Sequence, residues 1–86
     1  MKTKSSLVLR QVINFWMVVP LATQSRLESL LKLNETGAML WKILEQGAEL
    51  SDLANALVKE YGIPYEQAEQ DAQQFIQKLA DTGCLE

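Results

Sequence analysis

A chain of 86 residues, 48% of them hydrophobic, can build one domain around one modest core, which leaves little material for a deep cleft between two lobes. It has no histidine and one cysteine, which excludes an intramolecular disulfide, the usual zinc-ligand sets and the commonest general base. The net charge of −3 is unevenly spread, because residues 1–33 carry five basic residues and one acidic residue, whereas residues 34–86 carry three basic and ten acidic residues. The acidic second part repels phosphate backbones and attracts basic partners.

The N-terminal part of the sequence predicts a flexible tail and a β-hairpin. Residues 1–6 are polar and form the tail, and residues 7–86 form a single domain. Residues 7–12 form a first strand, and residues 15–19 are aromatic and β-branched, which favours a second strand over a helix. Asn14 marks the tight turn between these strands.

A third short strand follows after a polar loop over residues 22–28. It spans residues 29–33, where apolar and polar residues alternate. One face carries Leu31 and Leu33, which we expect to pack inward, and the other carries Leu30 and Lys32. Because three strands precede all of the helices, the order does not match an alternating parallel α/β sheet.

Three helices complete the chain, and local signals mark their ends. Asn34 is the predicted N-cap of the first helix, and Gly47 lies just past its end. Ser51 is the predicted N-cap of the second helix, which Gly62 terminates. The third helix runs from about residue 64 or 65 to about residue 82. The expected fold class is α+β, with a three-stranded antiparallel sheet followed by three helices.

Each predicted helix has an apolar stripe at helical spacing, and we interpret these stripes as core faces. They comprise Leu40, Trp41 and Leu44 in the first helix, Leu53, Leu57 and Tyr61 in the second, and Ala68, Ala72, Phe75, Ile76 and Leu79 in the third. Gly37 lies inside the first turn of the first helix, where it costs about 1 kcal/mol relative to alanine. Close packing against the sheet would justify that cost.

Neither the cysteine nor the hydropathy indicates export. We interpret Cys84 as a small apolar residue at a helix terminus, and a lone thiol suits a reducing compartment. The apolar run over residues 15–22 is short and is interrupted by Pro20, so it is neither a signal-peptide core nor a bilayer span. We therefore expect a soluble, cytoplasmic protein with no membrane partner.

The run Leu33-Asn34-Glu35-Thr36-Gly37-Ala38, with Trp41 three positions on, resembles the signature of the PqqD-like family. The resemblance extends from about Leu7 through the acidic, amphipathic segment AEQDAQQFIQKLADTGCLE. It implies a winged helix-turn-helix-like domain that binds the leader segment of a ribosomally made precursor peptide and delivers it to a modifying enzyme, often a radical SAM protein. In the founding example, the pathway makes the cofactor pyrroloquinoline quinone.

The resemblance also implies where the peptide binds: it adds to the third strand, and the last helix forms a wall beside it. The predicted peptide-binding residues are Ser29, Leu30, Leu31, Lys32, Leu33, Asp71, Gln74, Phe75 and Lys78. Edge strands carry unpaired backbone groups that another chain can complete. The predicted partners are the precursor peptide and a radical SAM or other peptide-modifying enzyme. An exposed strand edge can also pair with the same edge of a second copy, so a homodimer is a further alternative.

Several of these residues also have simpler explanations. Lys32 suits an edge-strand residue that prevents aggregation, and Asp71 suits a solvated helix position. Trp41 is favoured as a core residue over a ligand-facing one. Trp16 has two interpretations that the sequence does not distinguish: an exposed aromatic residue of a strand, or an anchor at an interface.

Three other functions compete with peptide recognition. The fold permits a DNA-binding winged helix, but the third helix carries four acidic residues against Lys78, and no arginine follows Arg26. Ser51 at a helix start is compatible with an acidic carrier protein, but an N-cap explains that serine, and the strands do not suit a helical carrier. An enzyme is least supported, because the sequence shows no nucleophile–base pair and no phosphate-binding glycine loop, and we expect no catalytic residue, metal or cofactor.

Overall fold

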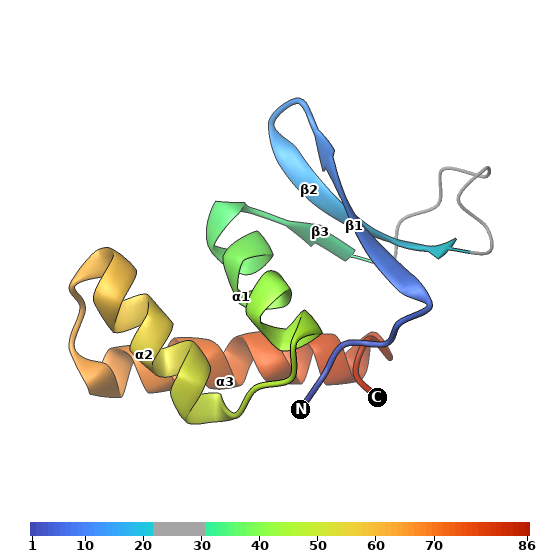
Figure 1. The fold of residues 1–86 in the computed structure, drawn as a ribbon. Helices are drawn as coiled ribbons and strands as arrows, with labels where there is room; N and C mark the ends of the chain where they lie inside the picture. The colour runs from blue at the N-terminus through green and yellow to red at the C-terminus, as the bar shows by residue number, and fades with distance from the viewer. Residues whose placement is uncertain (22–30) are drawn as a thin grey trace.

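The computed structural model describes residues 1–21 and 31–86 (Figure 1). In chain order its elements are β1 (Leu7–Val12), β2 (Phe15–Pro20), β3 (Leu31–Leu33), α1 (Glu35–Glu45), α2 (Leu50–Tyr61) and α3 (Tyr65–Asp81). The predicted α+β fold, a three-stranded antiparallel sheet followed by three helices, is confirmed. The predicted loop over residues 22–28, and Ser29 and Leu30 of the predicted third strand, lie outside the described residues.

The sheet has the strand order β1-β2-β3, so β1 and β3 are its two edges. A two-residue turn joins β1 to β2 and closes on the pair of Val12 and Phe15, with Ile13 93% exposed at its tip. Within the described residues, β3 pairs with β2 alone, in a register that sets Leu31 opposite Val18. The predicted hairpin is therefore present, and the short third strand pairs with its second strand to complete a three-stranded sheet.

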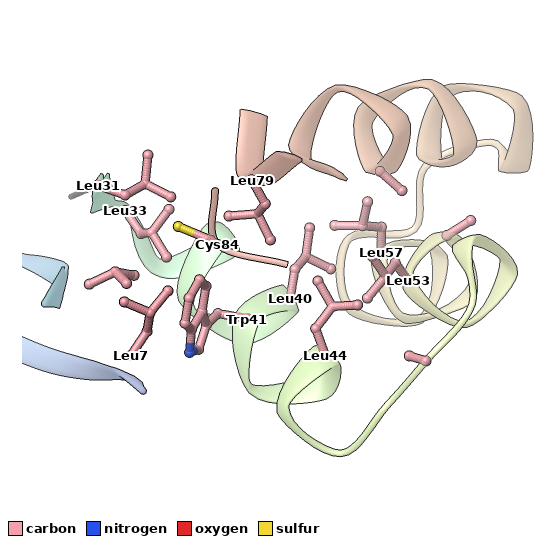
Figure 2. Close-up of a cluster of buried hydrophobic side chains, with 14 of the residues drawn as sticks. Leu7, Leu31, Leu33, Leu40, Trp41, Leu44, Leu53, Leu57, Leu79 and Cys84 are labelled. Carbon is pink, nitrogen blue, oxygen red and sulfur yellow. The ribbon is translucent and has the colours of Figure 1, made fainter. Parts of the chain in front are cut away.

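The hydrophobic core lies where the inner face of the sheet meets the helices (Figure 2). Trp41 is fully buried near its centre, as predicted, and Leu31 and Leu33 face it from the sheet, also as predicted. Cys84 is fully buried just beyond the end of α3, which confirms its interpretation as an apolar terminus residue. Tyr61 departs from the predicted stripe: it is the last residue of α2, beyond the reach of the core, and is 49% exposed.

The helix ends follow the predicted signals with one exception. The Oδ1 atom of Asn34 accepts a hydrogen bond from the Gly37 N–H at 2.8 Å, so Asn34 is the N-cap of α1. The prediction of Ser51 as the second N-cap is wrong, because α2 begins one residue before it and Glu49 is the N-cap. The Asp52 carboxylate accepts a hydrogen bond from the Glu49 N–H at 2.8 Å, which stabilises this earlier start.

Residues 1–4 are held by backbone hydrogen bonds instead of forming the predicted flexible tail. Thr3 pairs with Leu85 in an isolated antiparallel bridge, and the Ala48 N–H donates to the Met1 carbonyl at 2.8 Å. Both termini accordingly lie side by side (Figure 1). The prediction failed because these partners lie more than forty positions away in the sequence, and the local composition of residues 1–6 does not indicate such long-range pairing. Across residues 1–21 and 31–86, no helix combines the length and the apolar composition that crossing a membrane requires.

Candidate functional site

A groove of about 1060 Å³ lies between the β3 edge of the sheet and α3. The sheet side includes Phe15, Lys32 and Leu33, and the first turn of α1 continues this wall. From α3 the lining residues are Gln67, Asp71, Gln74, Phe75 and Lys78. These five recur at spacings of three and four residues, so they form one face of the helix, and that face borders the groove.

The floor of the groove is apolar. Leu33, Leu40 and Leu57 line it while being almost completely buried, with exposed fractions of 3%, 2% and 2%. Phe75 and Ile63 are half-buried, pack against the core and also border the groove. The groove therefore opens onto the hydrophobic core, so an apolar side chain placed in it would extend the core.

The backbone of β2 shows which of its residues turn their main-chain groups toward β1. A turn of two residues closes on a pair that exchanges hydrogen bonds, which here is Val12 with Phe15. At the other end of the hairpin, the Leu21 N–H donates to the Ser6 carbonyl at 2.8 Å. Both observations give the same alternation, in which odd-numbered residues from 15 to 21 bond toward β1.

The same alternation fixes the orientation of β3. The even-numbered residues Trp16 and Val18 direct their main-chain groups toward β3, where their partners are Leu33 and Leu31. Lys32, between these two, must turn its N–H and carbonyl away from β2, toward the open side of the sheet. Neither group has a hydrogen-bond partner within residues 1–21 and 31–86. Among the described residues, Lys32 therefore brings one unpaired main-chain donor and one unpaired acceptor to the border of the groove.

Three charged side chains line the groove, and two of them are cationic. The Lys32 ammonium lies 4.3 Å from the centroid of the Phe15 ring, a cation–π contact at the sheet wall. Asp71 and Lys78 project from α3, and neither makes an ion pair with any part of the chain that the structure describes. Two cations and one anion give the groove lining a net charge of +1, with Lys32 from the basic first part of the sequence and Asp71 and Lys78 from the acidic second part.

A hydrogen bond joins α1 to α2 beside the groove. The hydroxyl groups of Thr36 and Tyr61 are 2.7 Å apart, and both residues line the groove. Gly37 lies next to them, and a Cβ atom there would approach the Cβ of Leu33 to 3.2 Å. The predicted close packing of Gly37 against the sheet is therefore confirmed, and it allows α1 to start directly beside β3.

The structure brings together six of the nine predicted peptide-binding residues. Lys32, Leu33, Asp71, Gln74, Phe75 and Lys78 line the groove. Leu31 instead faces the core, and Ser29 and Leu30 lie outside the described residues. Peptide binding by these residues stays a prediction.

Sequence reasoning did not identify Asn14, Phe15, Asn34, Thr36, Gly37, Leu40, Leu57, Tyr61, Ile63 and Gln67 as groove residues. Gln67 had a usable signal, because it lies one helical turn before Asp71 on the same face of α3. The two tryptophans lie away from the groove lining. Trp41 is fully buried, and its Nε1–H donates to Glu45 at 3.3 Å. Trp16 is half-buried, and its Nε1–H donates to Glu35 at 3.3 Å.

Comparison with known proteins identifies the family. No curated protein sequence matches the chain. Among solved structures, TbiB1 in complex with the TbiA(beta) leader peptide superposes with a TM-score of 0.79 at 24% identity, covering 100% of this chain and 95% of that one. A lasso peptide synthetase B1 complexed with the leader peptide gives a TM-score of 0.76 at 22% identity, covering 96% and 93%. These likenesses show a shared fold. The sequence matches the family of Coenzyme PQQ synthesis protein D (PqqD) over residues 18–85, which is most of its length, and the chain belongs to that family.

Proposed function

We propose that this protein is a non-catalytic recognition domain that binds the leader segment of a ribosomally made precursor peptide by adding it as a strand to β3. The observation that carries the proposal is the main chain of Lys32, which turns its N–H and carbonyl toward an edge that no described strand covers, beside a groove walled by α3. An added strand pairs with both groups and directs alternate side chains onto the apolar floor. Membership of the PqqD family, and the leader peptides bound to two proteins of the same fold, support this reading.

The other edge of the sheet is a weaker candidate for strand addition. No strand of the described residues pairs with the outer edge of β1, since the sheet order ends there. No residue of β1 lines the groove, however, so a peptide at that edge would gain main-chain hydrogen bonds without the apolar floor and the α3 wall. Main-chain pairing alone does not distinguish one peptide from another, because selectivity comes from side-chain pockets. A recognition function therefore favours β3.

A second partner completes the proposed role. We propose that the domain also binds a modifying enzyme, which is a radical SAM protein or another peptide-modifying enzyme. Binding substrate and enzyme together raises the local substrate concentration at the active site to about millimolar. This gain in effective concentration, and not a chemical step on the domain itself, is the proposed contribution to the reaction.

The proposal is tested by titrating the ¹⁵N-labelled protein with a synthetic peptide that corresponds to the N-terminal part of a candidate precursor, taken from any short open reading frame found near its gene. We expect chemical-shift changes at Lys32 and Leu33 and along the groove face of α3, and slower hydrogen exchange of the Lys32 amide. A scrambled peptide of the same composition is the control. Shift changes confined to β1 or to the outer face of α2 would refute the site, and an absence of binding by the peptide would refute the function.

A further inference from the structure

Strand addition at β3 determines which side chains of the peptide lie beside Lys32. Side chains of neighbouring strands share the pleat, so the residue opposite Lys32 lies on the same face as Lys32, and its two neighbours lie on the opposite face. Leu31 and Leu33 are buried on that opposite face, whereas Lys32 is exposed. The peptide residue opposite Lys32 therefore stays in solvent, and its neighbours point toward the core side, where the groove floor is apolar.

The exposed position opposite Lys32 is a site for a charge. The Lys32 ammonium rests over the Phe15 ring, 4.3 Å from its centroid, and has no carboxylate partner within residues 1–21 and 31–86. Phe15 also lines the groove, so this cation is held at its edge by an aromatic ring. Directly opposed charges of unlike sign stabilise neighbouring strands, and like charges destabilise them. An acidic side chain at this position would complete the pair.

The second wall carries a further cation. Lys78 is the basic residue of α3, and it lies on the face that borders the groove. A lysine in the last turn of α3 interacts favourably with the helix dipole on any face of the helix. The dipole therefore does not explain why Lys78 lies on the face that borders the groove. Asp71, the acidic residue of the lining, lies two helical turns earlier, about 10 Å along the axis at 1.5 Å per residue. The end of the groove near Lys78 is therefore cationic.

We infer that the groove selects a peptide segment in which an acidic residue stands between two apolar residues, with the acid beside Lys32 and the apolar side chains over Leu33 and Phe75. The inference rests on the proposed function and specifies the chemistry of the peptide that the site takes. If Lys32 serves only to prevent edge-to-edge aggregation, no preference for an acidic peptide is expected, because that role depends on the charge of the protein and not on the charge of a ligand.

The test is a selection of displayed random short peptides against three forms of the folded protein: wild type, Lys32→Glu and Lys59→Glu. Lys59 is an exposed lysine of α2 outside the groove lining, so its replacement makes the same charge change away from the site. We expect wild type and Lys59→Glu to enrich an acidic residue between two apolar residues. Lys32→Glu should enrich lysine or arginine at the same position.

A quantitative arm uses one selected peptide and its Glu-to-Lys variant, measured by fluorescence anisotropy. For wild type the variant should bind about three- to tenfold more weakly, and for Lys32→Glu the order of the two peptides should reverse. Lys32→Gln should reduce the preference without reversing it.

The outcomes separate the two proposals. Selected peptides that protect the Lys32 amide from exchange but show no charge preference, or a preference that Lys32→Glu leaves unchanged, would overturn the inference and leave the proposed function standing. If no selected peptide changes the chemical shifts of the groove residues, both the proposed function and the inferred charge preference are refuted.

Discussion

Replacing Lys32 with proline separates the folding role of β3 from its binding role. The Lys32 N–H points away from β2, so proline removes no hydrogen bond from the sheet, and edge strands tolerate proline at such positions. We expect the free energy of unfolding to change by no more than about 1 kcal/mol. The donor needed by an added peptide strand is lost, and the unpaired peptide carbonyl costs about 1–3 kcal/mol, which corresponds to a roughly 5- to 150-fold weaker affinity.

The assay combines anisotropy of a labelled leader peptide with denaturant unfolding, and two variants are its controls. Lys32→Ala keeps the N–H and so reports the contribution of the side chain alone. Gln11→Pro places the same ring on the outer edge of β1, at an exposed residue whose N–H also points away from β2 by the alternation. A folded Lys32→Pro protein with wild-type affinity would refute strand addition at β3. Loss of affinity in Gln11→Pro instead would place the peptide on the other edge.

Three further predictions concern the helices and the core. Asn34→Ala removes the acceptor of the Gly37 N–H and should lower stability by about 1 kcal/mol, or roughly 4–8 °C in Tm by circular dichroism, whereas Ser51→Ala should change stability by less than about 0.5 kcal/mol because Glu49 is the N-cap. Equal losses in both variants would contradict the assigned caps. Cys84 is fully buried, so a chromogenic disulfide reagent should react with it at the rate of unfolding and not at the rate of an exposed thiol; rapid reaction in native buffer would contradict this packing. Random duplex DNA should show no salt-dependent gel shift, because α3 carries four acidic residues and one lysine, and a shift that weakens with salt would revive the winged-helix alternative.

The helix boundaries were predictable because their signals are local. Asn34 and Gly62 work through hydrogen bonds and backbone angles within a few residues, and both have the predicted roles. The wrong prediction of Ser51 as an N-cap also has a local cause. Glu49 and Asp52 form a competing start three residues apart, and the sequence alone does not rank a serine cap against this pair.

The groove was predictable along α3 and much less so elsewhere. The spacing of Asp71, Gln74 and Lys78 fixes one helix face whatever the rest of the fold does. The bond between Thr36 and Tyr61 joins residues 25 positions apart, and helical periodicity alone assigns Tyr61 to a core stripe. Such contacts depend on where one helix ends relative to another, and that geometry is set by the packed core and not by any local pattern.

The short length of β3 limits what main-chain pairing can contribute to peptide affinity. Among the described residues of β3, Lys32 alone directs its N–H and carbonyl to the open side, and two hydrogen bonds contribute about 1–3 kcal/mol net. A micromolar complex requires about 8 kcal/mol after the cost of association. In the proposed binding mode, the larger share must therefore come from peptide side chains buried on the floor formed by Leu33, Leu40 and Leu57. The proposal therefore predicts that the edge of β3 sets the register of the peptide, and that the groove between the sheet and α3 supplies most of the affinity and selectivity.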